Sequence, residues 1–276
     1  MTQHATEIRT FDSGDGPLAY LDTGTGRPLV LLHGGLMDHR MWEDQLPALT
    51  PEHRVIAPDI RGHGASANAS RPFRPADDLA GLLRHLGLGP VVVVGLSMGG
   101  GIALDLALEH PELVSALVIS GNGTSEPEFQ DPWLDEIAAE EARALAEGDV
   151  EGWISAFTRL AAGPQRSLGE VDREVVRRLK EMTRGTIAKH TPDEPQHLVP
   201  VADTWKRLAG ITVPLLAVNG GIDSPDHIGM AERVARSVAD GRTETVAGTG
   251  HYPNMERPEE FNAHLLGFLR TLPSQS

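Results

Sequence analysis

The sequence contains no cysteine. Disulfide bonds, thiolate nucleophiles and thiolate-bound metal sites are therefore excluded for this chain. Basic residues are also few, because 24 lysines and arginines stand against 39 aspartates and glutamates, which gives a formal net charge of -15. A negative field of this size repels phosphate backbones and anionic lipids, so we expect no binding to nucleic acids or to membrane surfaces.

Long apolar runs are missing as well. No stretch reaches the roughly 20 apolar residues that a membrane-spanning helix needs, and residues 1–12 mix charged and polar side chains where a secretory signal would be apolar. The sequence therefore predicts a cytoplasmic protein. A chain of 276 residues buries about three quarters of its unfolded surface, which suits one large domain or one domain with an insertion.

Short aliphatic or β-branched runs, bounded by glycine and proline, recur along the chain and predict strands. They cover residues 28–32, 54–57, 91–94, 113–119, 213–218 and 243–246. Helical patterns alternate with these runs and cover residues 77–86, 98–109, 226–239 and 258–269. Because continuous apolar strands alternate with helices, we expect an α/β fold with a mostly parallel sheet and helices on both faces.

The alternation breaks between residues 122 and 205, where no convincing strand is found. This interval is too long for a loop in a compact domain, and it contains three amphipathic helical patterns. We therefore expect a core domain made of residues 1–121 and 206–276, with an inserted helical cap at 122–205.

A serine lies between a predicted strand and a predicted helix, in the run Gly95 to Gly99, which reads Gly-Leu-Ser-Met-Gly. The backbone must double back tightly at such a turn, and the two glycines provide the space. Ser97 is then exposed at the carboxyl edge of the sheet, beside the N–H groups of the following helix. An ordinary glycine-rich turn is the alternative, but the strand before and the helix after favour a nucleophile.

A serine nucleophile needs a base, which is usually a histidine held by a third group. Of the twelve histidines, His251 lies in a loop between the last predicted strand and the last predicted helix. The remaining histidines that we considered lie in helical patterns, near helix ends, near the start of the chain or in a loop: His264, His85, His110, His4 and His63. For His63, stabilisation of its loop is the favoured interpretation.

An orienting acid is expected at the carboxyl end of a strand, where ligand crevices of α/β sheets lie. Asp223 follows the predicted strand 213–218 through a glycine-containing turn. Asp226 is the nearest rival, but Pro225 before it indicates a helix start, where aspartate is a normal capping residue. The sequence therefore favours Asp223.

An oxyanion hole needs two hydrogen-bond donors that are fixed before the reaction. We expect one donor to be the backbone N–H of Met98, directly after the serine. The second is expected in the loop after Leu32, where His33, Gly34 and Gly35 leave the main chain uncovered, and we favour the N–H of Gly35. A plain glycine turn is the alternative for this loop.

These motifs together carry a family resemblance. They are His33-Gly34-Gly35, Trp42, the run Pro58 to Ser66, the serine turn, Asp223 and Gly250-His251. In order and spacing they resemble the α/β-hydrolase superfamily, and the serine, acid, histidine order matches it too. The resemblance spans nearly the whole chain outside the expected cap, and it implies an eight-stranded, mostly parallel sheet.

Within that superfamily the chain looks most like enol-lactonases and small-ester hydrolases, through Gly34 to Trp42 and Arg61 to Ser66. The serine at position 97 differs from the aspartate of haloalkane dehalogenases and soluble epoxide hydrolases. The chain also lacks the three-glycine oxyanion motif of one lipase group, because Leu36 follows Gly35.

The expected cap changes charge along its length. Residues 126–151 are acidic with only Arg143 opposing, and residues 159–189 are mainly basic. Solvated helix faces paired with one another are the favoured explanation, and an arginine that binds a substrate carboxylate is the alternative. Apolar residues expected to line a substrate pocket are Leu36, Trp133, Trp153 and Phe157.

The sequence thus predicts a metal-free and cofactor-free serine hydrolase, a carboxylesterase or lactonase acting on a small molecule. The same scaffold also serves cofactor-free perhydrolases, haloperoxidases, cyclases and lyases, or ligand-binding receptors, since fold does not fix function. The substrate and any assembly into a homo-oligomer are not determined by the sequence.

Overall fold

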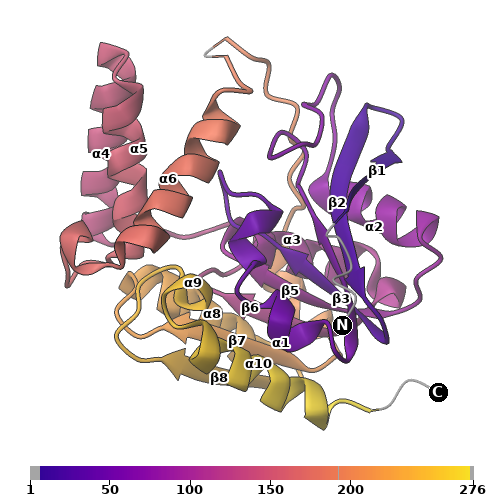
Figure 1. Cartoon of the computed structure of the whole chain (residues 1–276). Coiled ribbons are helices and arrows are strands. Elements are labelled where there is room, and N and C mark those ends of the chain that lie inside the picture. The colour runs from indigo at the N-terminus through magenta and orange to yellow at the C-terminus, as the bar shows by residue number, and fades with distance from the viewer. Residues whose placement is uncertain (1–6, 192, 274–276) are drawn as a thin grey trace.

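The computed structural model describes residues 7–191 and 193–273, and its centre is one eight-stranded sheet (Figure 1). The strand order is β1-β2-β4-β3-β5-β6-β7-β8. The strands are β1 (Ile8–Asp12), β2 (Pro17–Gly24), β3 (Arg27–Leu32), β4 (His53–Pro58), β5 (Val91–Leu96), β6 (Val114–Ser120), β7 (Leu215–Gly220) and β8 (Gly241–Val246). Strands β3 to β8 pair in parallel, whereas β2 pairs antiparallel with both β1 and β4. This is the α/β-hydrolase fold, as predicted.

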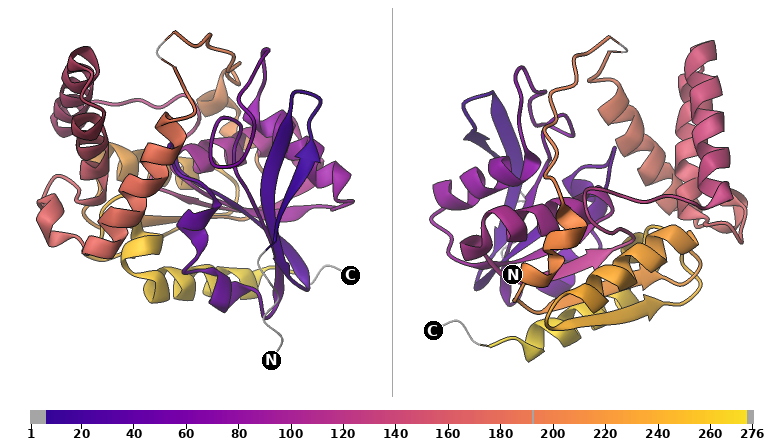
Figure 2. Two further views of the ribbon diagram at one scale, coloured as in Figure 1. Left: turned by 45° about the horizontal axis from the view of Figure 1, so that its top comes forward. Right: turned by 180° about the vertical axis from the view of Figure 1, so that it is seen from behind.

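Helices cover both faces of the sheet (Figures 1 and 2). Those of the core are α1 (Leu46–Leu49), α2 (Pro75–His85), α3 (Met98–Glu109), α7 (Thr204–Arg207), α8 (Pro225–Ser237), α9 (Pro253–Glu256) and α10 (Pro258–Thr271). Successive residues of a strand point to opposite faces. In β5, Val91 and Val93 belong to the core under α2, α3 and α8, while Val92 and Val94 belong to the core under α1 and α10.

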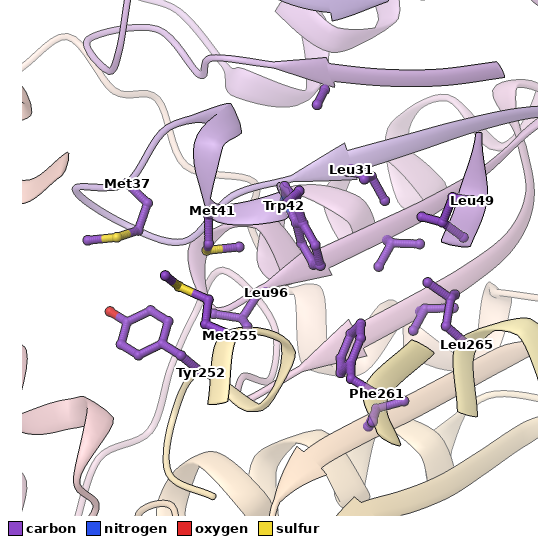
Figure 3. Close-up of a cluster of buried hydrophobic side chains, with 14 of the residues drawn as sticks. Leu31, Met37, Met41, Trp42, Leu49, Leu96, Tyr252, Met255, Phe261 and Leu265 are labelled. Carbon is purple, nitrogen blue, oxygen red and sulfur yellow. The ribbon is translucent and has the colours of Figure 1, made fainter. Parts of the chain in front are cut away.

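Aromatic and sulfur-containing side chains fill the second of these cores (Figure 3). The rings of Trp42 and Phe261 lie 6.1 Å apart between centroids, and both side chains are fully buried. Tyr252 and Met255 join the same cluster from the segment that follows His251. Hydrophobic packing therefore anchors the loop that carries this histidine.

The cap helices lie between β6 and β7 in the chain. They are α4 (Pro132–Glu147), α5 (Val150–Thr158) and α6 (Arg173–Ile187). Helices α4 and α5 lie side by side, away from the sheet, and α6 lies closer to the core (Figures 1 and 2). The expected boundary between residues 205 and 206 falls inside α7. The domain limits stay a prediction. Among the described residues, no helix combines the length and the apolar character that a bilayer crossing requires.

The structure contains each of the six strands and four helices predicted from the sequence, with ends shifted by a few residues. The hairpin of β1 and β2 was not predicted. Strand β1 is almost entirely exposed and lies at the sheet edge, so no apolar pattern marks it. Strand β2 is fixed by antiparallel pairing with β4, a contact between residues far apart in the sequence.

Candidate active site

Ser97 sits at the sharp turn between β5 and α3. Its backbone has φ 54° and ψ -119°, a combination that L-residues rarely adopt and that surrounding structure must hold in place. A Cβ atom at Gly95 would overlap the carbonyl oxygen of Gly99, and one at Gly99 would overlap that of Leu32. Glycine is therefore required at both flanking positions because the backbone approaches closely there, as the sequence predicts.

Asp223 and His251 meet beside this turn. Asp223 follows β7 and His251 follows β8, and the His251 Nδ1 to Asp223 Oδ2 distance is 2.8 Å. Both side chains are buried. Burial opposes ionisation of Asp223, but the adjacent imidazoles of His251 and His227 outweigh it and hold the pKa of this carboxyl well below its usual range. The acid therefore stays ionised and fixes the orientation and tautomer of the His251 ring.

A second histidine on the same carboxylate was not predicted from the sequence. His227 lies in the first turns of α8, and its Nδ1 is 2.9 Å from Asp223 Oδ1. Burial lowers the pKa of His251, Asp223 raises it and His227 lowers it further, with a net downward direction. The four-residue spacing from Asp223 to His227 is the signal that could have identified this contact, since such positions face each other on a helix.

One short stretch of backbone joins the serine turn to the histidine. The Ser97 N–H donates to the carbonyl of Ser120 at 2.8 Å, and Gly121 follows directly. A Cβ atom at Gly121 would lie 2.9 Å from both Cε1 and Nδ1 of His251 and 3.2 Å from Asp223 Oδ2. The structure thus places Asp223 and His251 against Gly121, and it joins Ser97 to the preceding residue, Ser120, through the backbone bond. The Ser97 hydroxyl forms no hydrogen bond with the described residues.

The loop after β3 lies against the same turn. A Cβ atom at Gly34 would be 3.6 Å from Cβ of Ser97. The His33 ring fixes this loop, because its Nδ1 is 2.8 Å from the Gly34 carbonyl and its Nε2 accepts from the N–H of Ile60 at 2.9 Å. The N–H of Gly35 has no partner within the described residues, and the N–H of Met98, at the start of α3, has no acceptor inside the helix.

The predicted pocket residues are placed in two different regions. Leu36 has φ 61°, and its side chain packs partly buried against the core. Trp153 and Phe157 stack on α5 with ring centroids 5.7 Å apart and planes 8° apart, and Trp133 lies in the first turn of α4. The cavity that includes Ser97 is lined by other residues, chiefly of the segments 122–129 and 198–201.

Arginines of the cap form ion pairs. Arg159 pairs with Glu140 at 2.7 Å and Arg184 with Glu151 at 2.8 Å, each joining the basic part of the cap to its acidic part. Arg178 instead reaches Asp44 of the core at 2.6 Å. These contacts agree with the solvated, paired helix faces favoured from the sequence.

One cap arginine contacts the loop that carries His251. We define the histidine loop as residues 247–252. The N–H of Gly250 donates to Glu256 Oε1 at 2.7 Å, and Arg166 reaches Glu256 Oε2, also at 2.7 Å. The N–H of His251 donates to the carbonyl of Leu160 at 3.2 Å. The cap segment 160–166 therefore helps to position the histidine loop.

His63 supports its own loop, as the favoured interpretation predicts. Its Nδ1 lies 3.1 Å from the carbonyl of Arg61, and its ring is 5.2 Å from that of His33. Burial, and then the nearby His33, lower the pKa of His63 to about 3. The imidazole of His63 is therefore neutral in the folded protein.

Two side-chain clusters bring possible metal ligands together within the described residues. One is Asp223, His227 and His251, and the other is Asp38, His39 and Asp59. In both, histidine nitrogens already contact carboxylate oxygens at 2.8 or 2.9 Å. Hydrogen bonds therefore account for these clusters, and no metal ion is needed to explain them.

The doubly covered parallel sheet, the serine turn and the strand-end residues define an enzyme scaffold of a known class. The model of the alpha/beta hydrolase fold family matches residues 27–258. The chain belongs to the α/β-hydrolase family.

Known members of the family resemble this chain over most of its length. A 2-hydroxy-6-oxononadienedioate/2-hydroxy-6-oxononatrienedioate hydrolase from Burkholderia vietnamiensis is 30% identical, across 91% of this chain and 90% of that protein. In three other matched relatives the aligned part spans only 36%, 64% and 37% of their length.

Solved structures are similar over nearly the entire chain. A thermophilic esterase from Thermogutta terrifontis has a TM-score of 0.76 at 27% identity, covering 96% of this chain and 98% of that one. An N-acyl homoserine lactone degrading enzyme has a TM-score of 0.73 at 26% identity, covering 95% and 100%. A bromoperoxidase from Bacillus anthracis has a TM-score of 0.77 at 25% identity, covering 96% and 99%.

Proposed function

We propose that this protein hydrolyses a small-molecule carboxylic ester or lactone through a serine acyl-enzyme. Ser97 is the nucleophile, His251 the general base and acid, and Asp223 the orienting acid. The backbone N–H groups of Met98 and Gly35 form the oxyanion hole. The observation that carries the proposal is the buried Asp223–His251 contact of 2.8 Å beside the strained serine turn.

In the first half-reaction, Nε2 of His251 takes the proton of the Ser97 hydroxyl as the oxygen attacks the acyl carbon. The carbonyl oxygen gains negative charge and is stabilised by the two backbone N–H groups. The imidazolium is stabilised by Asp223, which is ionised. The His251 imidazolium then donates its proton to the leaving alkoxide, and the acyl group remains on Ser97.

In the second half-reaction, His251 takes a proton from water, and the resulting hydroxide attacks the acyl-enzyme. Collapse of the tetrahedral intermediate breaks the bond to Ser97 Oγ, which is reprotonated by His251, and the carboxylic acid leaves. The pKa of His251 is lowered. This suits the role of a base, because the ring is neutral and able to accept a proton at physiological pH.

The relatives support the chemistry to different degrees. The esterase and the lactone-degrading enzyme are similar in structure over almost the entire chain, which supports an ester or lactone substrate. The bromoperoxidase is about equally similar and favours cofactor-free perhydrolysis as the second candidate. The cytoplasmic location and a homo-oligomer stay predictions.

The proposal is tested with a fluorophosphonate probe and a panel of short-chain p-nitrophenyl esters and lactones. Ser97 should be labelled, and Ser97→Ala should lose labelling and at least about a thousandfold in turnover. Ser167→Ala, in the cap, is the matched control and should keep both. Undiminished turnover by Ser97→Ala would refute the serine mechanism, and saturable ligand binding with no turnover of any ester or lactone would favour a receptor. Halide-dependent peroxidation without ester cleavage would favour the second candidate.

A further inference from the structure

A cavity of about 300 Å³ extends from Ser97 along one face of helix α3. Residues 97, 101 and 105 share this face because they are four residues apart, and all three line the cavity. Position 101 is glycine and adds no side chain to this wall, and the nearest atoms to a Cβ built there are Asn122 Nδ2 at 3.3 Å and Ser125 N at 3.4 Å. Eight residues of helix correspond to about 12 Å, which is the length of the groove from the nucleophile turn to Asp105.

The walls of this cavity are apolar at the entrance. They come from the segment 122–129 on one side and from residues 198–201 on the other. Phe129 and Leu198, which line the cavity, are 51% and 57% exposed. A short alkyl chain placed here would cover apolar surface that is otherwise in water.

Asp105 gives the far end of the cavity an unbalanced negative charge. Its residue exposure is 6%, and its carboxylate accepts a hydrogen bond of 2.7 Å from the Ser125 hydroxyl. Within the ranges that the structure describes, no lysine, arginine or histidine forms an ion pair with it. A buried carboxylate without a cationic partner is costly, and a cationic ligand would remove that cost.

The neighbouring charges do not fill this role. Arg74, at the rim of the cavity, and Arg207 both contact Glu109, at 3.4 Å and 2.6 Å. Glu109 and Glu126 add negative potential at Asp105, and Arg207 offsets part of it. Burial is the main cause that raises the pKa of Asp105 to about 6, so the carboxylate is largely ionised at neutral pH and the site favours a cation.

We propose that this cavity is a substrate subsite for an alkyl chain that ends in a primary ammonium group, with Asp105 as its counter-charge. The inference rests on the proposed function, because the acyl carbon must be held at Ser97 while the chain runs along α3. It goes further by naming the substrate class, which is an ω-amino acyl ester or a lactone with an aminoalkyl substituent.

The first test compares two substrates that differ only at the end of the chain. They are p-nitrophenyl ω-aminohexanoate and p-nitrophenyl heptanoate, in which a methyl group replaces the ammonium. In the wild-type protein, kcat/KM for the amino ester should exceed kcat/KM for the heptanoate by about tenfold or more. This ratio corresponds to the free energy of a charged hydrogen bond in a partly buried site. Equal kcat/KM values for the two esters would overturn the subsite.

The second test removes the charge of Asp105. In Asp105→Asn the preference for the amino ester should fall to about one, since the amide keeps the shape and the bond to Ser125 but not the charge. Asp135→Asn, on the exposed side of α4, removes the same charge elsewhere and should keep the preference. A purely structural role of Asp105 would lower both rates equally and leave their ratio unchanged, which would contradict the proposal.

A binding experiment separates this inference from the proposed function. Hexylammonium and hexanol are titrated into the wild-type protein and into Asp105→Asn, with binding followed by NMR. If no ester is hydrolysed, the proposed function fails, but binding of hexylammonium over hexanol that depends on Asp105 would still support the subsite. Equal binding of the two ligands, or binding of hexylammonium that is unchanged in Asp105→Asn, would overturn it.

Discussion

The rings of His227 and His251 lie against each other, with centroids 4.2 Å apart and planes inclined by 34°. Their Nδ1 atoms contact different oxygens of the same carboxylate, Asp223 Oδ1 at 2.9 Å and Oδ2 at 2.8 Å. A proton gained by one ring is therefore opposed by positive charge on the other. Asp223 also shares its charge between two donors, which leaves less of it to stabilise the His251 imidazolium.

This arrangement predicts the effect of His227→Phe on the pH profile. The aromatic ring is kept, but its contact with Asp223 is lost, so the pKa of His251 should rise. The proposed mechanism requires the neutral imidazole, and the acid limb of kcat/KM should therefore move to higher pH, by about half a unit to one unit. His264→Phe, on α10, should leave the profile unchanged. A shift to lower pH, or lower activity with an unshifted profile, would contradict the assigned role of His227.

Gly121 offers a test of the packing around the histidine. It has φ 60°, and a Cβ atom would lie 2.9 Å from the His251 ring. Gly121→Ala should displace the ring and lower kcat by about a hundredfold. Gly87 has the similar φ of 62° but no heavy atom near a new Cβ, so Gly87→Ala carries the same backbone strain of about 1 kcal/mol. Because only Gly121→Ala adds a steric clash to this strain, we expect it to lose more stability than Gly87→Ala, which should keep full activity. Full activity in both variants would contradict the placement of His251.

His63 makes the free energy of unfolding depend on pH. The unfolded chain binds a proton at this ring below pH about 6.5, whereas the folded ring, with a pKa of about 3, stays neutral. Acid therefore favours the unfolded state, and His63 contributes about 2 kcal/mol to the stability lost between pH 7 and pH 5.

In His63→Asn that part of the loss should disappear, and chemical denaturation at the two pH values measures it. His264→Asn, at a partly exposed site on α10, should retain the wild-type pH dependence. If His63→Asn and the wild type lost equal free energy of unfolding between pH 7 and pH 5, the folded protein would not be holding the His63 ring in its neutral form.

Arg166 neutralises Glu256, which also holds the histidine loop. Arg166→Met leaves this carboxylate mostly buried without its cation, so the free energy of unfolding should fall by about 3 kcal/mol, and kcat should fall with it. Adding Glu256→Gln should restore part of the stability. In Arg177→Met, which breaks two exposed ion pairs on α6, the loss should stay under about 1 kcal/mol. Equal losses for the two arginine variants, measured by denaturation, would argue against the Arg166 contact.

Much of the fold could be predicted because its signals are local. The strands β3 to β7 contain short apolar runs, β8 contains β-branched residues, and the serine turn lies within five consecutive residues. Parallel strands end at one edge of a sheet, so residues that follow β5, β7 and β8 were expected to meet, and Asp223 and His251 are in contact. The catalytic roles of these residues stay predictions until they are tested by mutation.

Other features could not be predicted because they arise from contacts across the chain. The helix that contains His227 shows an ordinary amphipathic pattern, and apart from the four-residue spacing nothing in the sequence marks a bond to Asp223. The cavity along α3 is closed by segments 122–129 and 198–201, which are far apart in the sequence. The stacked contact of Trp153 and Phe157 on α5 was not predicted either, and their place in a substrate pocket stays a prediction.

The bonds from segment 160–166 to the histidine loop affect how this enzyme can be re-engineered. Leu160 and Arg166 belong to the cap, yet they hold the backbone of His251 and its neighbour Glu256. A chimera that exchanges the whole cap for that of a relative would therefore disturb the position of His251, the proposed general base, along with the selectivity. Grafts that replace α4 and α5 but retain residues 159–166 should alter substrate range while preserving the turnover number.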